Sequence, residues 1–481
     1  MSHEDDRGSA RGWDQDGMNG TATAYASWGG VHPEYNKVTA SCALERLPVS
    51  SRLLVSLAQN LGAPASAVVK KGDSVARGQL IAEPSGFVSA SVHAPTSGTV
   101  KSVAPLPTAS GRTATVIEIE ADGEDRWHES IVPPEDWQAL DAKALVERVA
   151  QAGIIGMGGA GFPTHVKLSP PPGKSIDTLI VNGAECEPFL TADHRLMLEQ
   201  ADRIWGGVQI IKKILGVARV RVAVEDNKPD AIAAMQEVAE STGTGDVAVV
   251  ALPTEYPQGA EKQLIYAVTG REVPSGGLPM DVGALVENVG TAAAIYEAVA
   301  DGWPLTERVV TVSGDLVKEP KNLVARVGTP FAELLRACGG LAGPLGKVIC
   351  GGPMMGIAQP SLEVAMNKTT SGLLFLSRDW VGQFSSMPCI GCARCVVACP
   401  MNLMPCSLSE FIEAEDYAGA EAEHVLDCIE CGCCAFECPA HRPLVQHMKR
   451  AKAEVTARRR QREAEQKAKS EVGNRKSEIG S

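Results

Sequence analysis

The pattern of apolar and polar positions changes character along the chain. Between residues 50 and 120, short apolar runs alternate with turn signals such as Lys71-Gly72-Asp73, which predicts a module of short strands. From Leu140 onward, apolar runs alternate with amphipathic stretches of helical period. We predict strands at 178–181, 217–224 and 246–252, and helices at 145–152, 202–215 and 230–240. Such alternation favours a parallel or mixed sheet with covering helices.

The pattern changes again near residue 306. We predict a strand at 309–313, a helix at 331–338 and a glycine-rich turn at 351–356. Farther on, Ser407 or Ser409 is expected to cap a helix that contains Phe411, Ile412 and Tyr417. At the other end of the chain, residues 1–26 are polar and rich in glycine, which predicts a disordered tail.

Composition narrows the class of protein. The chain has 481 residues, of which 44% are hydrophobic and 4% aromatic, as is typical of a globular α/β protein with several domains. Its net charge of -13 argues against general nucleic-acid binding. No run approaches ~20 continuous apolar residues, and the N-terminus has no apolar signal core. Most of the 14 cysteines cluster between residues 389 and 438, which indicates metal binding in a reducing compartment.

The clustered cysteines follow the spacing C-x2-C-x2-C-x3-C-P twice. Two residues between thiolates let a tight loop bring three sulfurs to one iron–sulfur cube, and the fourth cysteine of each run ligates the other cluster. We therefore predict two [4Fe–4S] clusters with crossed ligands. The first set is Cys389, Cys392, Cys395 and Cys438, and the second is Cys428, Cys431, Cys434 and Cys399. The alternatives are a pair of zinc sites, which usually use two C-x2-C pairs, or a disulfide knot. Cys406 and Cys433 remain as surplus thiols.

A glycine-rich loop precedes the first predicted strand of the α/β region. It contains Gly156, Gly158, Gly159 and Gly161, and is followed by Lys167. Glycine permits close approach of the backbone to a ligand, and free N–H groups in such a loop form a nest for phosphate. The loop lacks both the strand–GxGxxG–helix order of a dinucleotide fingerprint and the Gly-Lys-Ser/Thr ending of a P-loop.

Polar residues follow the predicted strand at 178–181. Asn182, Glu185 and Glu187 stand at its carboxyl end, where open α/β sheets bind ligands. The structural alternative is that the two glutamates cap the next helix. Cys186, between them, is expected to be a buried structural thiol.

These motifs resemble known families. Gly156-x-Gly-Gly-Ala-Gly-Phe-Pro-Thr-x-x-Lys167 and Asn182-x-x-Glu185-x-Glu187-Pro188 resemble the FMN- and NADH-binding subunit of respiratory complex I. Gly29-Gly-Val-His-Pro33, Tyr256-Pro-Gln-Gly259 and the doubled ferredoxin motif make residues 29 to 448 similar to the C subunit of the Rnf electron-transport complex. The resemblance implies that FMN is held by the glycine loop and by Lys167, Asn182, Glu185, Glu261, Asn288 and Thr291. It also implies that Phe162 and Glu187 face NAD(H). Ala184 departs from the complex I motif, which has Asp there.

The resemblance also gives each part of the chain a fold. We predict a multidomain α/β plus α+β protein in which a disordered tail and a charged tail enclose four domains. The parts are the tail at 1–26, a barrel-sandwich hybrid at 27–135, an FMN/NADH-binding α/β domain at 136–305, an SLBB-like β-grasp at 306–380, a two-cluster ferredoxin-like helical domain at 381–448 and the charged tail at 449–481. The charged tail carries a net positive charge. It either contacts anionic lipid or acidic partners, or only keeps the chain in solution.

The implied function is electron relay. A nicotinamide transfers two electrons as hydride, a cluster accepts one at a time, and FMN connects the two. The resemblance implies a peripheral subunit at the cytoplasmic face of the inner membrane, in an ion-translocating NADH:ferredoxin-type oxidoreductase. Its partners would be membrane subunits and a ferredoxin or flavodoxin-like carrier. The alternatives are a soluble cobalamin reductase, in which the glycine loop comes near the N-terminus, and an adaptor without a flavin.

Overall fold

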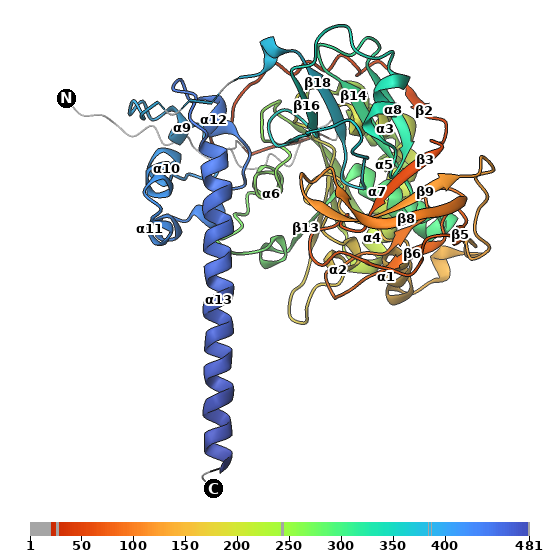
Figure 1. Cartoon of the computed structure of the whole chain (residues 1–481), viewed down its shortest axis with the longest axis horizontal. Coiled ribbons are helices and arrows are strands. Elements are labelled where there is room, and N and C mark those ends of the chain that lie inside the picture. The colour runs from red at the N-terminus through yellow and green to blue at the C-terminus, as the bar shows by residue number, and fades with distance from the viewer. Residues whose placement is uncertain (1–20, 26–27, 242–244, 383, 386, 480–481) are drawn as a thin grey trace. The chain divides into compact units, whose positions relative to one another are not determined.

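The computed structural model describes residues 21–25, 28–241, 245–382, 384–385 and 387–479 (Figure 1). The chain divides into two compact units, and each is described by itself. The first consists of residues 1–26 and 32–381, and the second of residues 27–31 and 382–481. The first unit contains the sheets, and the second is helical.

A five-stranded parallel sheet lies in the first unit, in the order β1-β12-β11-β10-β13. Its strands are β1 Thr21–Thr23, β10 Thr178–Asn182, β11 Arg219–Glu225, β12 Asp246–Leu252 and β13 Ala284–Asn288. Every residue of β13 is buried, as expected of a parallel strand covered on both faces. Because the strands are parallel, their carboxyl ends lie along the same edge, so that loops far apart in sequence meet there.

Helices cover both faces of this sheet. One core joins Leu179 and Val181 of β10 to α3 Ala192–Glu199 and to four further helices. These helices are α1 Ala142–Gln151, α4 Ala201–Leu215, α5 Pro229–Ser241 and α7 Val289–Tyr296. The opposite core joins Ile180 to α6 Glu261–Thr269. Alternate residues of β10 therefore enter opposite cores, as the two-residue period of a strand requires. The short helices α2 Thr164–Lys167 and α3 Ala192–Glu199 follow the glycine-rich loop and β10.

The barrel-sandwich module consists of two antiparallel sheets, in the orders β3-β9-β8-β5 and β4-β6-β7. Val55, Ile81, Val100 and Ile117 fill the space between the sheets. The strands are β3 Arg52–Ser56, β4 Ser66–Ala67, β5 Ser74–Val75, β6 Leu80–Glu83, β7 Val92–His93, β8 Gly98–Pro107 and β9 Thr113–Ala121.

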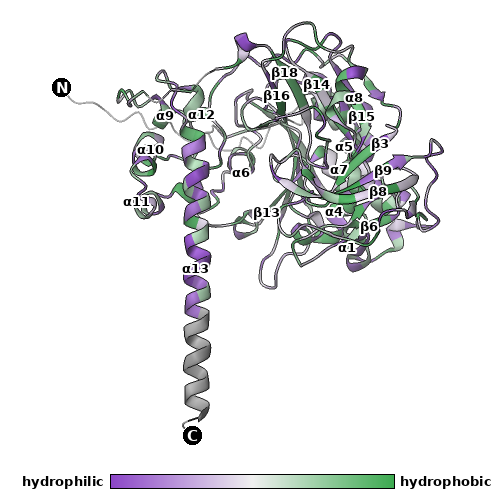
Figure 2. Ribbon diagram, viewed as in Figure 1, coloured by the Kyte–Doolittle hydropathy of each residue, from purple (hydrophilic) through white to green (hydrophobic). Residues whose placement is uncertain are grey.

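The β-grasp module has a six-stranded mixed sheet in the order β17-β16-β18-β14-β15-β2. Phe331 and Leu334 of α8 Phe331–Ala337 pack against it, and Figure 2 shows the apolar residues along β16 and β18. The strands are β2 Leu44–Arg46, β14 Glu307–Ser313, β15 Lys321–Arg326, β16 Lys347–Cys350, β17 Ile357–Ala358 and β18 Gly372–Leu376. A segment from near the N-terminus, β2, thus completes a sheet formed mostly by residues 307–376.

The second unit is built from short helices around one long helix. They are α9 Arg394–Val397, α10 Pro405–Glu413, α11 Tyr417–Ala422, α12 Cys433–Phe436 and α13 Leu444–Ile479. Leu408, Ile412, Met448 and Val455 form its main core. The helix predicted for this region differs from the one observed. Because Pro405 occupies the first turn and starts α10, Ser407 and Ser409 lie inside the helix and do not cap it, and Tyr417 begins α11.

The prediction of a disordered N-terminal tail is wrong for residues 21–23. Thr21–Thr23 form β1 and pair in parallel with Val249–Ala251 of β12. Main-chain hydrogen bonding to an open sheet edge requires no apolar pattern, so composition did not indicate this strand. Residues 1–20 and 26 of the predicted tail lie outside the described residues.

Candidate functional site

The glycine-rich loop is anchored at the carboxyl edge of the parallel sheet. Met157 donates its N–H to Thr291 Oγ1 at 3.0 Å, and Gly156 donates its N–H to the carbonyl of Phe162 at 2.9 Å. A Cβ at Gly158 would come within 2.9 Å of the Asn288 side chain, so this position requires glycine. The loop is thereby held against the N-terminus of α7, the helix that Asn288 caps through the N–H groups of Gly290 and Thr291.

One side of the loop is open. Gly158, Gly159 and Ala160 are exposed, and a Cβ built on Gly159 would meet no atom within 4 Å. Lys167 lies at the end of α2, and its Nζ is 2.9 Å from Glu261 Oε1. Burial lowers the pKa of Lys167, but the carboxylates of Glu287 and Glu261 raise it by more. The net pKa lies above the usual value, so the amine is charged at neutral pH.

Asn182 links two loops at the same edge. Its Nδ2 donates to the carbonyl of Gly259 at 2.9 Å, and its Oδ1 accepts from the N–H of Ala184 at 3.1 Å. The Asn288 Nδ2 donates to Asp193 Oδ2 at 2.6 Å. The structure therefore brings the glycine loop, Lys167, Asn182, Glu261, Asn288 and Thr291 together at one edge of the sheet.

The two glutamates after β10 have different partners. Glu185 accepts N–H groups from Asp193 at 2.8 Å and His194 at 3.1 Å, so its carboxylate caps α3. For Glu185 the structure thus favours the structural alternative, in which the glutamate caps the next helix. Glu187 caps no helix, because it accepts the N–H groups of Met354 at 3.1 Å and Met355 at 2.8 Å in the β-grasp module.

Sequence reasoning missed the cations that support these loops. Lys37 Nζ donates to the carbonyls of Glu185, Glu187 and Leu190. Arg308, on β14, donates to the carbonyls of Met157 and Lys368 at 2.9 and 2.8 Å. Both residues come from segments far from the loops in sequence and follow no local motif, so no signal in the sequence indicated them.

The residues at this edge fit a polar, anionic nucleotide. Several buried side-chain atoms among the described residues have no hydrogen-bond partner: Glu225 Oε1, Gln258 Oε1, Glu287 Oε1, Thr164 Oγ1 and Tyr35 Oη. An unsatisfied buried polar group costs ~1–3 kcal/mol, and a bound ligand can recover that cost. The exposed glycine backbone and the charged Lys167 supply the donors that a phosphate requires.

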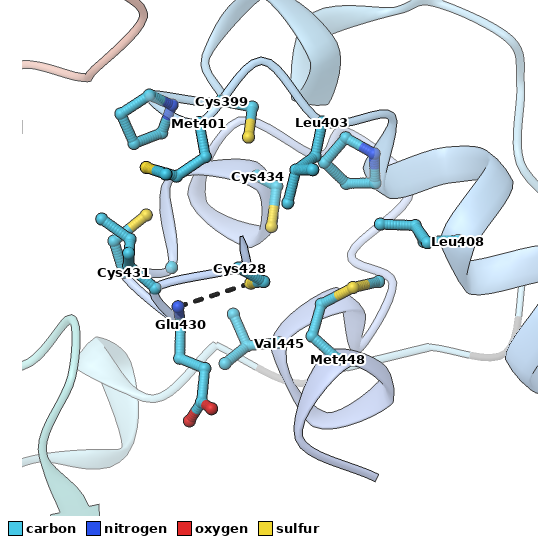
Figure 3. A pocket seen from close by; sticks show the side chains of 14 residues that line it. Cys399, Met401, Leu403, Leu408, Cys428, Glu430, Cys431, Cys434, Val445 and Met448 are labelled. Atoms are coloured by element: carbon cyan, nitrogen blue, oxygen red, sulfur yellow. Dashed lines mark hydrogen bonds between the residues drawn. The ribbon is translucent and has the colours of Figure 1, made fainter. Parts of the chain in front are cut away.

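Some cysteines of the second unit line a small cavity that is partly open to solvent. Four of its lining residues are Cys399, Cys428, Cys431 and Cys434, the set predicted for the second cluster. Figure 3 shows the sulfurs of Cys399, Cys428 and Cys434 around the central space. Its other walls are largely apolar, from residues such as Leu403, Leu408, Val445 and Met448. Among the residues that the structure describes, no three His, Cys, Asp or Glu side chains converge as a site for a single metal ion.

The segments that carry Cys389 and Cys438 are tied together. The N–H of Ser385 donates to the carbonyl of His441 at 2.8 Å, and its hydroxyl donates to the carbonyl of Ala440 at 2.7 Å. Arg442 Nη1 donates to the carbonyl of Met387 at 2.8 Å. The start of the first motif therefore lies beside the end of the second, as crossed ligands require.

The surplus cysteines contact predicted ligands or protein backbone. Cys433 is fully buried and is hydrogen-bonded to the Cys431 side chain, and Cys406 is hydrogen-bonded to Cys395. Cys186 accepts the N–H of Gly259 at 3.4 Å, and burial raises its pKa to about 12. Cys186 is therefore a half-buried, protonated thiol.

The fold defines a class of protein, one that joins a parallel α/β domain to a barrel-sandwich and a β-grasp. A family model of the Nuo51 FMN-binding domain matches residues 149–297, and the model of the RnfC barrel sandwich hybrid domain matches residues 25–124. A third, of the SLBB domain, matches residues 309–358. The predicted fold class is confirmed.

Curated relatives identify the family. The C subunit of the proton-translocating ferredoxin:NAD(+) oxidoreductase complex of Clostridium ljungdahlii is 48% identical, over 89% of this chain and 94% of that protein. The C subunit of the Na(+)-translocating ferredoxin:NAD(+) oxidoreductase complex of Acetobacterium woodii is 45% identical, over 90% of this chain and 97% of that protein. The chain belongs to the family of C subunits of ion-translocating oxidoreductase complexes, the Rnf family that its motifs resemble.

A solved structure, an NAD+-reducing [NiFe]-hydrogenase in the H2-reduced state, aligns with a TM-score of 0.47 and 19% identity. The alignment covers 69% of this chain and 70% of that one. In the part of the chain that the structure describes, no helix is both long enough and apolar enough to span a membrane.

Proposed function

We propose that this chain relays electrons between NAD(H) and a ferredoxin-type carrier through FMN and two [4Fe–4S] clusters. The observation that carries the proposal is that Cys399, from the first cysteine motif, lines the same cavity as Cys428, Cys431 and Cys434, from the second. Neither a zinc site built from C-x2-C pairs nor a disulfide knot calls for this combination.

The nucleotide side of the relay uses the edge of the parallel sheet. The N–H groups of the open glycine loop and the Lys167 ammonium would hold the FMN phosphate, while Asn182 and Asn288 keep the surrounding loops in place. Phe162 and Glu187 are proposed to face NAD(H). FMN, when bound, supplies the exchange between hydride and single electrons. For Glu185 we assign support of the loop rather than ligand contact, because both of its oxygens accept N–H groups of α3.

The cluster side uses thiolates and the backbone N–H groups near them. Gly391 N–H lies 3.4 Å from Cys389 Sγ, and Glu430 N–H lies 3.4 Å from Cys428 Sγ. These two contacts occupy equivalent places in the two motifs, two residues after the first cysteine of each. N–H···S bonds of this kind stabilise a thiolate and affect the potential of the cluster it holds.

The proposed setting is a peripheral position at the cytoplasmic face of the inner membrane. The partners would be the membrane subunits of the complex and a ferredoxin or flavodoxin-like carrier. The names of the relatives, which are subunits of ion-translocating ferredoxin:NAD(+) oxidoreductase complexes, support this setting. The soluble cobalamin reductase is disfavoured because the relatives cover about nine-tenths of the chain, including the barrel-sandwich module.

Paired cysteine substitutions test the crossed ligands. If Cys399 and Cys434 share a cluster, the double variant Cys399→Ser/Cys434→Ser should keep one cluster, whereas Cys395→Ser/Cys399→Ser should lose both. Iron and sulfide counts on anaerobically purified protein, together with EPR, measure this. Cys406→Ser is the control and should keep both clusters. Ligands confined within each motif would reverse the behaviour of the two double variants and would refute the proposal.

A bulky residue in the glycine loop tests the flavin site. Gly159→Trp should abolish FMN binding and the reduction of the clusters by NADH, without loss of iron, because the new side chain fills the open face of the loop. Gly86→Trp is a matched control in an exposed turn of the barrel, where the nearest atom to a new Cβ is 3.9 Å away. Flavin extraction and anaerobic absorbance spectra are the readouts. Reduction by NADH that survives in Gly159→Trp would place the flavin elsewhere.

A further inference from the structure

A buried arginine lies where the two cysteine motifs meet. Only 6% of the Arg442 side chain is exposed. Its Nη2 donates to Ser409 Oγ at 2.9 Å and lies 2.6 Å from Glu413 Oε1, and its Nη1 donates to the carbonyl of Met387. The Nε of Arg442 is buried and has no partner in the described chain. The Nε–H of the guanidinium is therefore a buried donor that can bind a group that the protein itself does not supply.

The position of this guanidinium is defined by the segments it joins. Met387 stands two residues before Cys389, and Arg442 stands four residues after Cys438. The pKa of Arg442 is raised first by its hydrogen bond to Glu413, and further by the charges of Glu413, Cys389 and Cys438. Arg442 is thus tied to the segments that carry two of the four cysteines of the predicted first cluster, Cys389 and Cys438.

We propose that Arg442 raises the reduction potential of the cluster held by Cys389, Cys392, Cys395 and Cys438, and that Glu413 partly offsets this effect. The proposal rests on the proposed function, because it needs the cluster. One electron taken from a reductant adds one negative charge to the site. A buried cation nearby stabilises that charge, whereas the carboxylate of Glu413 destabilises it.

The second cluster site has a weaker counterpart. Lys452 Nζ donates to the carbonyl of Cys428 at 2.9 Å and lies 2.6 Å from Glu430 Oε1. Its side chain is 27% exposed, so water screens its charge more than that of Arg442. A cation paired with a glutamate therefore lies beside each cysteine set, and the two pairs can be changed independently.

The test is an EPR-monitored redox titration of the full chain, with mediators and dithionite. Arg442→Gln should reduce the ratio of reduced to oxidised first cluster at fixed potential by about tenfold, which is 59 mV for one electron. Glu413→Gln should raise the same ratio by about threefold, because this carboxylate is 48% exposed and partly screened. Arg442→Lys, which keeps the charge, should restore most of the wild-type ratio.

Lys452→Gln is the matched control. It should shift the reduction potential of the second cluster and leave that of the first unchanged. The Arg442 and Glu413 variants should leave the potential of the second cluster unchanged. In a Cys399→Ser background, which removes a ligand of the second cluster, the EPR spectrum should contain the signal of the first cluster alone. An unchanged first potential in Arg442→Gln, or shifts of the same sign in Arg442→Gln and Glu413→Gln, would overturn the proposal. If the Arg442→Gln protein loses the first cluster, the direction of the potential shift in Glu413→Gln still tests the proposal. Fewer than two clusters in the wild-type protein would count against the proposed function instead.

Discussion

At the scale of single residues, the carboxyl edge of the parallel sheet stands out for glutamates whose pKa is raised. Burial raises the pKa of Glu185, Glu187 and Glu287 to about 7 in each case. Glu287 is 2% exposed, and its Oε1 has no hydrogen-bond partner in the described chain. Lys167 lowers its pKa, but not enough to offset burial. Ionised carboxylates at this edge are therefore costly for the folded protein, which a site selected only for stability would avoid.

Glu287 makes stability depend on pH. Its folded pKa lies above the unfolded value of about 4.3, so the folded state binds the proton more tightly. The resulting stabilisation is complete below pH ~4.3 and is lost as pH rises through about 7. Relative to Glu287→Gln, we expect the wild-type chain to lose ~2–3 kcal/mol of unfolding free energy between pH 4.5 and 8.

Urea unfolding at the two pH values measures this difference. Glu83→Gln, at an exposed position of the barrel, serves as the control and should leave the pH dependence unchanged. The assignment fails if wild type and Glu287→Gln respond equally to pH.

At the scale of elements, one face of α13 contributes to the core of the second unit. Leu444, Met448, Ala451 and Val455 are all buried and follow one another at intervals of four, three and four residues. That spacing places them on one side of the helix. Met448, Ala451 and Val455 belong to the core that contains Leu408 and Ile412, and Leu444 packs with Cys395 and Cys434. The cysteine loops are short and have few apolar residues of their own, so this helix supplies much of the hydrophobic support of the unit.

A charge on that face should disrupt the unit. We expect Val455→Asp to destabilise it by more than ~3 kcal/mol and to reduce the iron content, because an unpaired carboxylate would enter the core. Ala453→Asp is the matched control, since Ala453 is exposed on another side of the same helix. Thermal unfolding and iron counts measure both variants. Equal iron loss in both would show that helix propensity, not packing, explains the effect.

At the scale of the whole molecule, polar contacts join modules of the first unit that sequence treats as separate. Arg326 donates to Asp125 at 2.6 Å and lies 2.9 Å from Glu307, while Arg77 contacts the same two carboxylates. Asp125 follows the barrel-sandwich strands, and Glu307 begins the β-grasp strand β14. This partly buried ion network links the two modules, so each depends on the other for its compensating charges.

Removing the central cation should therefore be costly. We expect Arg326→Met to destabilise the chain by about 3 kcal/mol, because Asp125 and Glu307 lose their most buried partner. Arg46 also pairs with Glu307, but it is 62% exposed, and Arg46→Met should cost less than ~1 kcal/mol. Calorimetry compares the two variants. Similar small losses of unfolding free energy in both variants would show that the ion network does not stabilise one module through the other.

Sequence predicted much of the local structure of this protein. The strands at 178–181 and 246–252 and the helix at 202–215 agree with β10, β12 and α4 to within a residue. These elements carry their signal in a short periodic pattern. The cysteine spacing and the glycine loop are also local, because a tight loop around a ligand is set by a few consecutive residues. The family could be identified from these motifs, and the comparisons confirm it.

Tertiary structure alone decided which distant residues meet. The cap of Glu185 on α3, the bonds of Glu187 to Met354 and Met355, and the location of Arg442 depend on chain segments brought together by packing. The strand Thr21–Thr23 exists only because β12 offers an edge. Local patterns specify which element a segment forms, since neighbours in sequence share a helix face or a loop. Burial, hydrogen-bond partners and the charge around a site arise only when separate elements pack, and no local pattern records them.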